Sequence, residues 1–451
     1  MMGSEMKVEV IHKEAIRPSS PTPHYLKTTN LSVFDQLLPD IYVPFLLFYP
    51  NNNTDHRSLA AERSKILKTS LSEILTHFYP FAGKFHYNDS ICCNDHGVAF
   101  LEAQVNCPIS KILDKADIGM VKQLLPADMA SRQAVTGYLL LVQANFFECG
   151  GMAIGVSIAH KVADASTIST FIKRWAEIAL DSTSRPNTDC EAVLPAEFGV
   201  AASLFPPQDI LNAPQPTLEF PKEKCITRTY LFDTSKIAAL KSKSASATVP
   251  KPTRIEVVSA LIWKCAMEAS KSKFGSIRPS AWCHAVNMRN VLVRPSAENL
   301  LGNLVGKFIA RAGESEVVDL DLQSLVGKLR KGIEEFKVKY ANNVTGDACE
   351  SLKEYGDLLQ MDDIEIYTCS SWCRFPFYAA DFGWGKPSWV NQSLEGKNLI
   401  VLMDVRDGDG VEVSLTFNEE DMAIIESNKE LLAYASLGRN LILQKEVALV
   451  V

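Results

Sequence analysis

The sequence predicts a mixed α/β fold with two domains, and three observations support this. At 451 residues the chain is too long for one ordinary hydrophobic core. Patterns typical of strands and of amphipathic helices occur in both halves. Between them, from Pro186 to about Pro252, prolines interrupt any periodicity. We therefore expect an N-terminal domain over residues 1–185, a crossover segment over 186–252 and a C-terminal domain over 253–451.

The composition is that of a soluble globular protein. Hydrophobic residues make up 47% of the chain and charged residues 22%. The formal net charge of −7 argues against nucleic acid as the principal partner, since phosphate binding needs a positive surface. No apolar run approaches the ~20 residues that span a bilayer, and acidic residues stand where a signal peptide has its apolar region. We expect a cytoplasmic protein with no membrane partner.

Several known kinds of site are not indicated. Eleven cysteines are scattered without a Cys-x-x-Cys pair, which indicates reduced and mostly buried thiols. The histidines show no metal-ligand spacing, and the acidic run Asp404–Glu412 does not fit an EF-hand, so we expect no metal site. There is no P-loop or dinucleotide fingerprint. A Gly-x-Ser-x-Gly nucleophile motif is also missing, because the nearest match, Gly155–Ala159, ends in alanine.

In the first half, periodicity predicts two strands, a helix and a hairpin. Val8–Ile11 alternates like a strand, and Tyr42–Tyr49 is a near-continuous apolar run consistent with a buried strand. The apolar residues of Ser58–Phe78 recur at helical spacing. Ile91–Val105 predicts a hairpin that turns at Asn94-Asp-His-Gly97.

The middle of the chain predicts a hairpin followed by a helix. Tyr138–Phe146 and Met152–Ile158 are strongly β-prone, and Glu148-Cys-Gly-Gly151 joins them. The next helix has Asp164 where its N-cap would be. The residues on its apolar face are Ile168, Phe171, Ile172, Trp175 and Ile178. The second strand therefore delivers His160 to a strand-to-helix corner, a place where scaffolds often present reactive groups.

The second half repeats the alternation of strands and helices. Strands are predicted at Ile226–Phe232 and Ala281–Asn287, and helices at Arg254–Glu268, Leu322–Tyr340 and from Glu419 onward. The segments Ile400–Val405 and Val411–Phe417 predict a hairpin around Asp407-Gly-Asp-Gly410.

His160 and Asp164 each allow two interpretations from the residues alone. His160 is either a core histidine satisfied by backbone groups or a general base with a near-neutral pKa. Asp164 could orient His160, as an aspartate orients histidine in catalytic triads. The turn between them disrupts that geometry, however, and an aspartate at a helix start also serves as a cap or an ion-pair anchor.

A second unusual stretch is Asp381-Phe-Gly-Trp-Gly385. Two glycines around a tryptophan suit a tight loop whose backbone passes close to another group. They equally suit a structural turn with a packed indole, in which Asp381 accepts hydrogen bonds from the loop's own amides.

Together the two motifs resemble the plant BAHD acyltransferases, which are marked by His-x-x-x-Asp near mid-chain and Asp-Phe-Gly-Trp-Gly near the C-terminus. Both motifs stand intact here, in the same order and at similar separation. The resemblance extends over almost the whole chain. It includes Pro18–Pro23, Phe34-Asp-Gln-Leu37, Leu71–Gly83, Phe146–Gly151 and Val286-Asn-Met-Arg289. Within the family, the sequence looks most like the O-acetyltransferases of alkaloids and terpenoids.

The resemblance implies a fold and a reaction. It implies two chloramphenicol-acetyltransferase-like domains with mixed sheets, joined by a long crossover, with residues from about 370 to 398 completing the first domain. It implies that His160 is the general base and that Asp164 is structural and pairs with Arg289. Asp381 would be a structural anchor. The co-substrate would be acetyl-CoA or another acyl-CoA, and no cofactor would be bound permanently. The acceptor would be a small-molecule alcohol. The enzyme would be a monomer.

Further residues are expected around the implied channel. The motif loop would shape the CoA-side wall, and basic groups would suit the CoA phosphates. The candidates on the CoA side are Gly383, Trp384, Gly385, Ser371, Arg254, Lys251 and Lys307. Oxyanion donors are sought among Ser370, Ser371 and Trp384. The acceptor pocket is expected to use aromatic and apolar side chains. These are Phe34, Leu38, Phe375, Phe377 and Tyr378.

Three alternatives to acetyl transfer remain open at this stage. The enzyme could use an aromatic or longer acyl-CoA. The chain could be a non-catalytic paralogue that binds metabolites. It could also hydrolyse esters through the same base.

Overall fold

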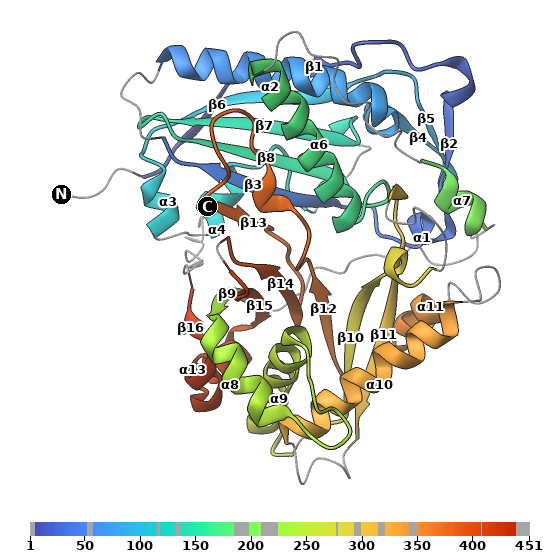
Figure 1. Ribbon diagram of the computed structural model, residues 1–451, viewed down its shortest axis with the longest axis vertical. Coiled ribbons are helices and arrows are strands. Elements are labelled where there is room, and N and C mark those ends of the chain that lie inside the picture. The colour runs from blue at the N-terminus through green and yellow to red at the C-terminus, as the bar shows by residue number, and fades with distance from the viewer. Residues whose placement is uncertain are drawn as a thin grey trace, which may run out of the picture.

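The structure is a computed structural model, and it describes residues 5–51, 57–114, 118–129, 131, 136–184, 198–208, 224–276, 278–292, 299–313, 321–341, 350–406 and 408–438. Two mixed sheets, each with its own helices, lie one above the other in Figure 1. The fold is therefore mixed α/β, as the sequence predicts. Much of the proline-rich part of the predicted crossover, 186–197 and 209–223, lies outside the described residues.

The first sheet has six strands in the order β1-β6-β7-β8-β3-β13. Its strands are β1 (Val8–Ile16), β6 (Val98–Val105), β7 (Leu140–Phe147), β8 (Met152–Ala159), β3 (Tyr42–Tyr49) and β13 (Trp389–Asn391). Only β6 and β7 run parallel. The predicted strand Tyr42–Tyr49 and the hairpin β7–β8 are confirmed, and the first strand extends to Ile16. β13 comes from late in the chain and pairs with β3.

Helices cover both faces of this sheet. The helices α2 (Arg57–His77) and α6 (Ala165–Ser184) lie side by side over one face, in front of the sheet in Figure 1. The opposite face packs against α3 (Ser110–Asp114) and α4 (Ile118–Gln123). Alternation along β3 explains this, because Phe45 and Leu47 face α2 and α6 while Leu46 and Phe48 face α3 and α4. A strand buried on both faces reads as one continuous apolar run.

The second sheet has seven strands in the order β11-β10-β12-β14-β15-β9-β16. They are β11 (Val305–Ala312), β10 (Ser280–Asn287), β12 (Glu365–Ser371), β14 (Leu399–Asp404), β15 (Val411–Asn418), β9 (Cys225–Phe232) and β16 (Ser436–Leu437). The pairs β10–β12 and β12–β14 are parallel and the others antiparallel. The predicted strand in the crossover is β9, which pairs with β15 and so belongs to this sheet.

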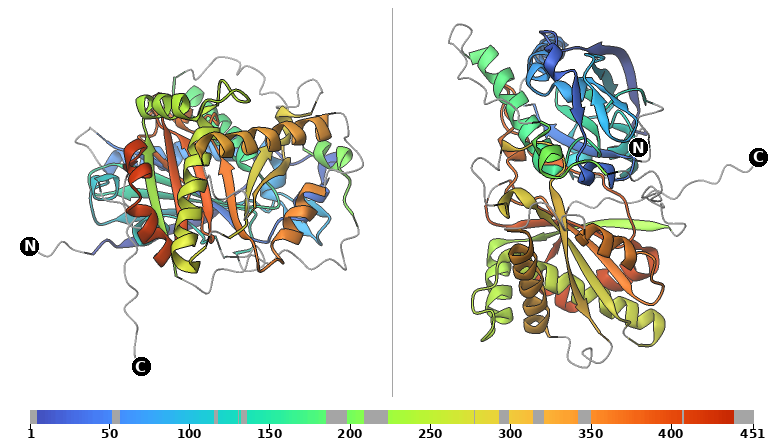
Figure 2. Two further views of the ribbon diagram at one scale, coloured as in Figure 1. Left: turned by 90° about the horizontal axis from the view of Figure 1, so that it is seen from below. Right: turned by 90° about the vertical axis from the view of Figure 1, so that its right-hand side faces the viewer.

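Most helices of the second half lie on one face of this sheet, as Figure 2 shows. They are α8 (Thr234–Ser244), α9 (Arg254–Phe274), α10 (Leu322–Ala341), α12 (Glu419–Glu426) and α13 (Lys429–Tyr434). On the other face α11 (Glu350–Leu358) packs on β10 and β11 through Leu358 and Tyr355. The predicted helices Arg254–Glu268 and Leu322–Tyr340 are confirmed, the first with six further residues.

One predicted strand pairing is wrong. Ile91–Val105 is not a hairpin, because β5 (Ser90–Cys92) pairs with β2 (Thr28–Asn30) and β4 (Lys84–His86) in a separate small sheet. The strand β6 pairs with β1 and β7 instead. The intervening turn is tied elsewhere, since the Asp95 carboxylate accepts hydrogen bonds from Thr22 and Lys27. The two β-prone runs were correct, but they do not pair with each other: β5 pairs with the neighbouring β4 and the distant β2, and β6 pairs with β1 and β7.

Short elements complete the described chain. They are α1 (Val33–Gln36), α7 (Val200–Leu204), η1 (His24–Leu26), η2 (Tyr79–Ala82), η3 (Met288–Asn290) and η6 (Phe377–Ala379). The helix α1 lies at the boundary between the two halves in Figure 1. Its Phe34 packs in the hydrophobic core of the second sheet, although α1 lies between β1 and β3 of the first sheet in the sequence.

We predict that Gly155→Ala destabilises the strand that carries the site. A Cβ atom there would lie 2.1 Å from the carbonyl oxygen of Leu124, and Asn145 Nδ2 also donates to that oxygen at 2.9 Å. Because Asn145 holds this carbonyl in place, the added methyl group would clash with it. The substitution should therefore cost about 1–3 kcal/mol of unfolding free energy. Urea unfolding followed by circular dichroism measures this cost. The control is Gly327→Ala in α10, which has open space and should be neutral or stabilising. Equal stability of the two variants would contradict the packing argument.

Candidate active site

His160 directly follows β8 and is held at both ends of its backbone. Its N–H donates to the carbonyl of Ile41 at 2.8 Å, and its own carbonyl accepts from Asn303 Nδ2 at 2.8 Å. The side chain is partly buried. The Nδ1 atom is buried and has no hydrogen-bond partner within the described residues. The backbone that carries the ring is therefore held on both sides.

The surroundings of His160 favour the neutral imidazole. Burial lowers the pKa of His160 below its usual value, and the positive charge of Lys307 acts in the same direction. The negative charge of Asp164 and the carbonyl groups of His160 and Ala163 oppose this shift only in part. A neutral imidazole at pH 7 can accept a proton, as a general base must.

Asp164 is directed away from His160. Its Oδ1 accepts from the backbone N–H of Thr167 at 2.8 Å, which caps α6 as predicted. Its Oδ2 accepts from Arg289 Nη1 at 2.6 Å and from the N–H of Leu304 at 3.0 Å. No hydrogen bond joins Asp164 to His160, both of which the structure describes. The carboxylate thus connects the first half of the chain to the second.

Arg289 completes this connection from the second half. It lies in η3, just after β10, and both members of the ion pair are almost fully buried. Its Nε donates to the carbonyl of Leu300 at 2.7 Å, and its Nη2 donates to the carbonyl of Gly302 at 2.8 Å and to Thr167 Oγ1 at 3.0 Å. The expected Asp164–Arg289 pair is therefore present, within a network that satisfies both charges.

The Asp381–Gly385 loop lies at the other end of β8. Asp381 Oδ1 accepts from the N–H groups of Gly383 and Gly385, each at 2.9 Å, and both glycines have positive φ. The Trp384 ring packs against Tyr49, which pairs with Met152 at the start of β8. Eight residues of strand separate Met152 from His160, or roughly 25 Å. The loop is a self-contained turn far from His160.

This position separates the loop from the reacting groups. Gly383, Trp384 and Gly385 are too far from His160 to contact groups that react there, so any contact of theirs with CoA would involve a part remote from the thioester. Trp384 is for the same reason no oxyanion donor. Its indole instead has the guanidinium of Arg63 5.4 Å from the ring centroid. Ser370 and Ser371 end β12, where Ser370 Oγ accepts from Trp372 Nε1 at 3.1 Å.

The basic candidates differ in their surroundings. Arg254 is already paired with Asp404 and also donates to the carbonyl of Asp409. Lys251 is exposed ahead of α9. The Nζ of Lys307 lies 3.1 Å from the ring centroid of Tyr355. Of the three, Lys307 is the one whose charge acts on His160.

Two of the expected acceptor-pocket residues are core residues. Phe34 and Phe377 are each 1% exposed. Phe34 packs edge-on against Phe205, and Phe377 packs against Phe45 and Trp372. Neither therefore offers a surface to a substrate. Leu38, Phe375 and Tyr378 are partly exposed and stay candidates.

The sequence analysis missed Asn303, which contacts the His160 carbonyl. Asn303 lies in the run Leu300-Leu301-Gly302-Asn303-Leu304, where it is the one side chain able to hydrogen bond. It is fully buried. A polar residue within an apolar run is the signal that could have singled it out.

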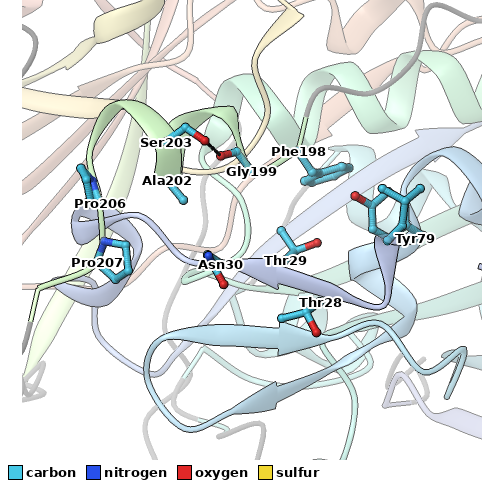
Figure 3. A pocket seen from close by; sticks show the side chains of 11 residues that line it. Thr28, Thr29, Asn30, Tyr79, Phe198, Gly199, Ala202, Ser203, Pro206 and Pro207 are labelled. Atoms are coloured by element: carbon cyan, nitrogen blue, oxygen red, sulfur yellow. Dashed lines mark hydrogen bonds between the residues drawn. The ribbon is translucent and has the colours of Figure 1, made fainter. Parts of the chain in front are cut away.

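One described pocket lies away from these groups. It has a volume of about 370 Å³ and lies between β2 and α7, as Figure 3 shows. Thr29, Asn30, Tyr79 and Ser203 are among its lining residues, whereas His160 is not. In the described residues, no group of three or more His, Cys, Asp or Glu could hold a metal ion. None of the described helices is both long and apolar enough to cross a membrane.

Comparisons with known proteins identify relatives over nearly the whole chain. A family model described as the Transferase family matches residues 6–432. Vinorine synthase from Rauvolfia serpentina is 38% identical over 425 residues, 93% of this chain and 96% of that protein. Its crystal structure superposes with a TM-score of 0.82 at 34% identity, covering 96% of this chain and 99% of that one.

Two further relatives carry more explicit names. Stemmadenine O-acetyltransferase from Catharanthus roseus is 35% identical, and the matched region covers 94% of this chain and 97% of that protein. Limonoid 7-O-acetyltransferase from Citrus sinensis is 35% identical, and the matched region covers 96% of this chain and 99% of that protein.

We predict that Arg289→Ala strongly destabilises the protein. The substitution leaves the Asp164 carboxylate buried without its charge partner, which should cost about 3–5 kcal/mol. The double variant Asp164→Ala/Arg289→Ala should lose less than the sum of the single losses. Thermal unfolding of the three variants measures this coupling. The control is Arg311→Ala, because Arg311 pairs with Glu354 on the surface and should contribute under about 1 kcal/mol. Additive losses at Asp164 and Arg289 would contradict the network.

Proposed function

The chain belongs to the Transferase family, that of the BAHD acyltransferases, and from this membership we propose that His160 is the general base of its reaction. The protein is an acyl-CoA-dependent acyltransferase that uses acyl-CoA as a co-substrate and a small molecule as acceptor. The observation that carries the proposed role is the state of His160. It is held by its backbone at a strand end, its pKa is lowered by burial, and its Nδ1 is unpaired within the described residues.

The proposed reaction is direct transfer within a ternary complex. The neutral His160 imidazole removes the proton from the acceptor hydroxyl, and the oxygen forms a bond to the thioester carbonyl carbon. The resulting tetrahedral oxyanion collapses, the carbon–sulfur bond breaks, and the imidazolium returns its proton to the CoA thiolate. No residue is acylated. The base should contribute ~10²–10⁴-fold to the rate.

Asp164 takes no part in these proton transfers in the proposed mechanism. Its carboxylate is engaged with Arg289, Leu304 and Thr167, so it acts on His160 only through space and through the corner that it holds. Asp381 has a structural role at the far end of β8. Of the candidate oxyanion donors, Ser370 and Ser371 remain.

The donor and the acceptor are proposed from the relatives. The names of two relatives specify O-acetylation, of stemmadenine in one case and of a limonoid in the other. We therefore propose acetyl transfer from acetyl-CoA to a hydroxyl of an alkaloid or terpenoid. The partly exposed Leu38, Phe375 and Tyr378 would contact such an apolar acceptor. We also propose that the enzyme works as a cytoplasmic monomer, and its nine described cysteines are free thiols in keeping with a reducing compartment.

A panel of donors and acceptors tests this proposal. The purified protein is incubated with acetyl-CoA, malonyl-CoA or an aromatic acyl-CoA and with a panel of alkaloid and terpenoid alcohols, and products are detected by mass spectrometry. We expect an acetylated product that His160→Ala forms at a rate ~10²–10⁴-fold lower, with unchanged thermal stability. Full activity of His160→Ala would refute the role of the base. Preference for another donor would overturn the choice of acetyl-CoA, and release of the free alcohol from an acetylated acceptor without CoA would indicate a hydrolase.

The pH dependence tests the state of His160. A general base works when it is deprotonated, so kcat/KM should rise with pH and level off above the pKa of His160. Because burial lowers that pKa, the midpoint of the rise should lie below 6.5. In Lys307→Met the loss of a nearby positive charge should shift the midpoint to higher pH. A wild-type midpoint above 6.5 would contradict the assignment.

A further inference from the structure

Asp35 is a buried carboxylate for which the proposed reaction has no use. It belongs to the Phe34-Asp-Gln-Leu37 run and is 5% exposed. Its Oδ2 accepts from the N–H and from the Oγ of Ser32, both at 2.7 Å, and its own N–H donates to Ser32 Oγ at 3.2 Å. These bonds form a capping box on α1. Because α1 has only four residues, capping alone does not explain a buried charge.

The second oxygen of Asp35 binds the other half of the chain. Oδ1 accepts from the backbone N–H of Asn303 at 2.9 Å and from Asn303 Nδ2 at 2.7 Å. The next N–H along, that of Leu304, donates to Asp164. The neighbouring N–H groups of Asn303 and Leu304 therefore bind two different carboxylates of the first half. Asp164 reaches them from the start of α6, and Asp35 reaches them from α1.

Asn303 continues the connection to His160. A carboxamide nitrogen has two hydrogens. Asn303 Nδ2 donates to Asp35 Oδ1 at 2.7 Å and to the carbonyl of His160 at 2.8 Å. Asn303 Oδ1 has no partner in the described part of the chain. The amide cannot be reversed, because its oxygen would then face the Asp35 carboxylate and the His160 carbonyl, two acceptors. Asp35 thus fixes the orientation in which Asn303 holds His160.

We propose that Asn303, oriented by Asp35, is a positioning residue for His160. The inference rests on the proposed role of His160 as the base. The N–H of His160 is fixed by the carbonyl of Ile41, which directly precedes β3, and its own carbonyl is fixed by Asn303. Without the second contact, the peptide after His160 can rotate and the imidazole moves relative to both substrates. A misplacement of about 1 Å costs up to ~10²-fold in rate.

Three variants separate positioning from stability. Asn303→Ala removes the donor to His160, and Asp35→Ala removes the group that orients this donor. The matched control is Ser32→Ala, which breaks the α1 capping box but leaves the Asp35–Asn303 contact in place. All three should lower the unfolding temperature. Should Asn303→Ala fail to fold, Asn303→Leu keeps the side-chain volume and still removes the amide.

Kinetics with the acceptor found in the panel provide the first readout. Asn303→Ala and Asp35→Ala should lower kcat by roughly 10- to 100-fold, with KM for acetyl-CoA little changed, because the lost contact serves the base rather than substrate binding. Ser32→Ala should keep the wild-type kcat. The inference is overturned if Asn303→Ala keeps full kcat, or if Ser32→Ala loses as much kcat as Asp35→Ala.

Nuclear magnetic resonance provides a second readout that needs no turnover. The protein is labelled with ¹³C at the histidine rings, and the His160 resonance is assigned by its loss in His160→Ala. Asn303→Ala and Asp35→Ala should shift or broaden this resonance, whereas Ser32→Ala should not. An unchanged resonance in the first two variants refutes the positioning role even if no acceptor is found. Conversely, a shifted resonance together with an active His160→Ala refutes the role of His160 as general base. It leaves intact the structural connection from Asp35 through Asn303 to His160.

Discussion

The buried ion pair between Asp164 and Arg289 is the constraint on which the site depends. Removing two charges from water is costly, so such a pair persists only where the remaining donors and acceptors are satisfied. Here they are satisfied by the first turn of α6 and by carbonyl and N–H groups of residues 300–304. The same bonds that compensate the burial therefore join the two halves directly beside His160. The hydrogen bonds around Asp164 and Arg289 thus contribute both to the stability of the fold and to the placement of His160.

The two family motifs act on one structural unit, the hairpin β7–β8 with α6. Asp164 caps the start of α6. At the opposite end of β8, the Asp381–Gly385 loop places Phe382 edge-on against Trp175, in the middle of the same helix. Phe382 and Trp175 are both fully buried. The loop can thus be essential to the enzyme without contact to the substrates, because it supports the helix whose first turn forms the joint with Arg289.

Local parts of this arrangement were predictable from the sequence, and long-range parts were not. Two β-prone runs joined by turn residues predicted β7–β8, and an aspartate before an amphipathic run predicted the cap of α6. The wrong hairpin at Ile91–Val105 arose because strand partners depend on distant segments. Likewise, composition could not separate a pocket wall from a core, as Phe34 shows. The contact of Asn303 with His160 joins residues 143 positions apart and has no periodic signal.

The engagement of Asp164 with Arg289 has a consequence for the chemistry of His160. In a Ser-His-Asp triad, the carboxylate accepts a hydrogen bond from the imidazole and stabilises its protonated form. Here that carboxylate is engaged elsewhere, so burial dominates and the pKa of His160 falls. The imidazole is then a weaker base than an ordinary histidine, and its neutral form is favoured. Because the proton it takes must be returned to the departing thiolate, a weakly held proton suits the second half of the reaction.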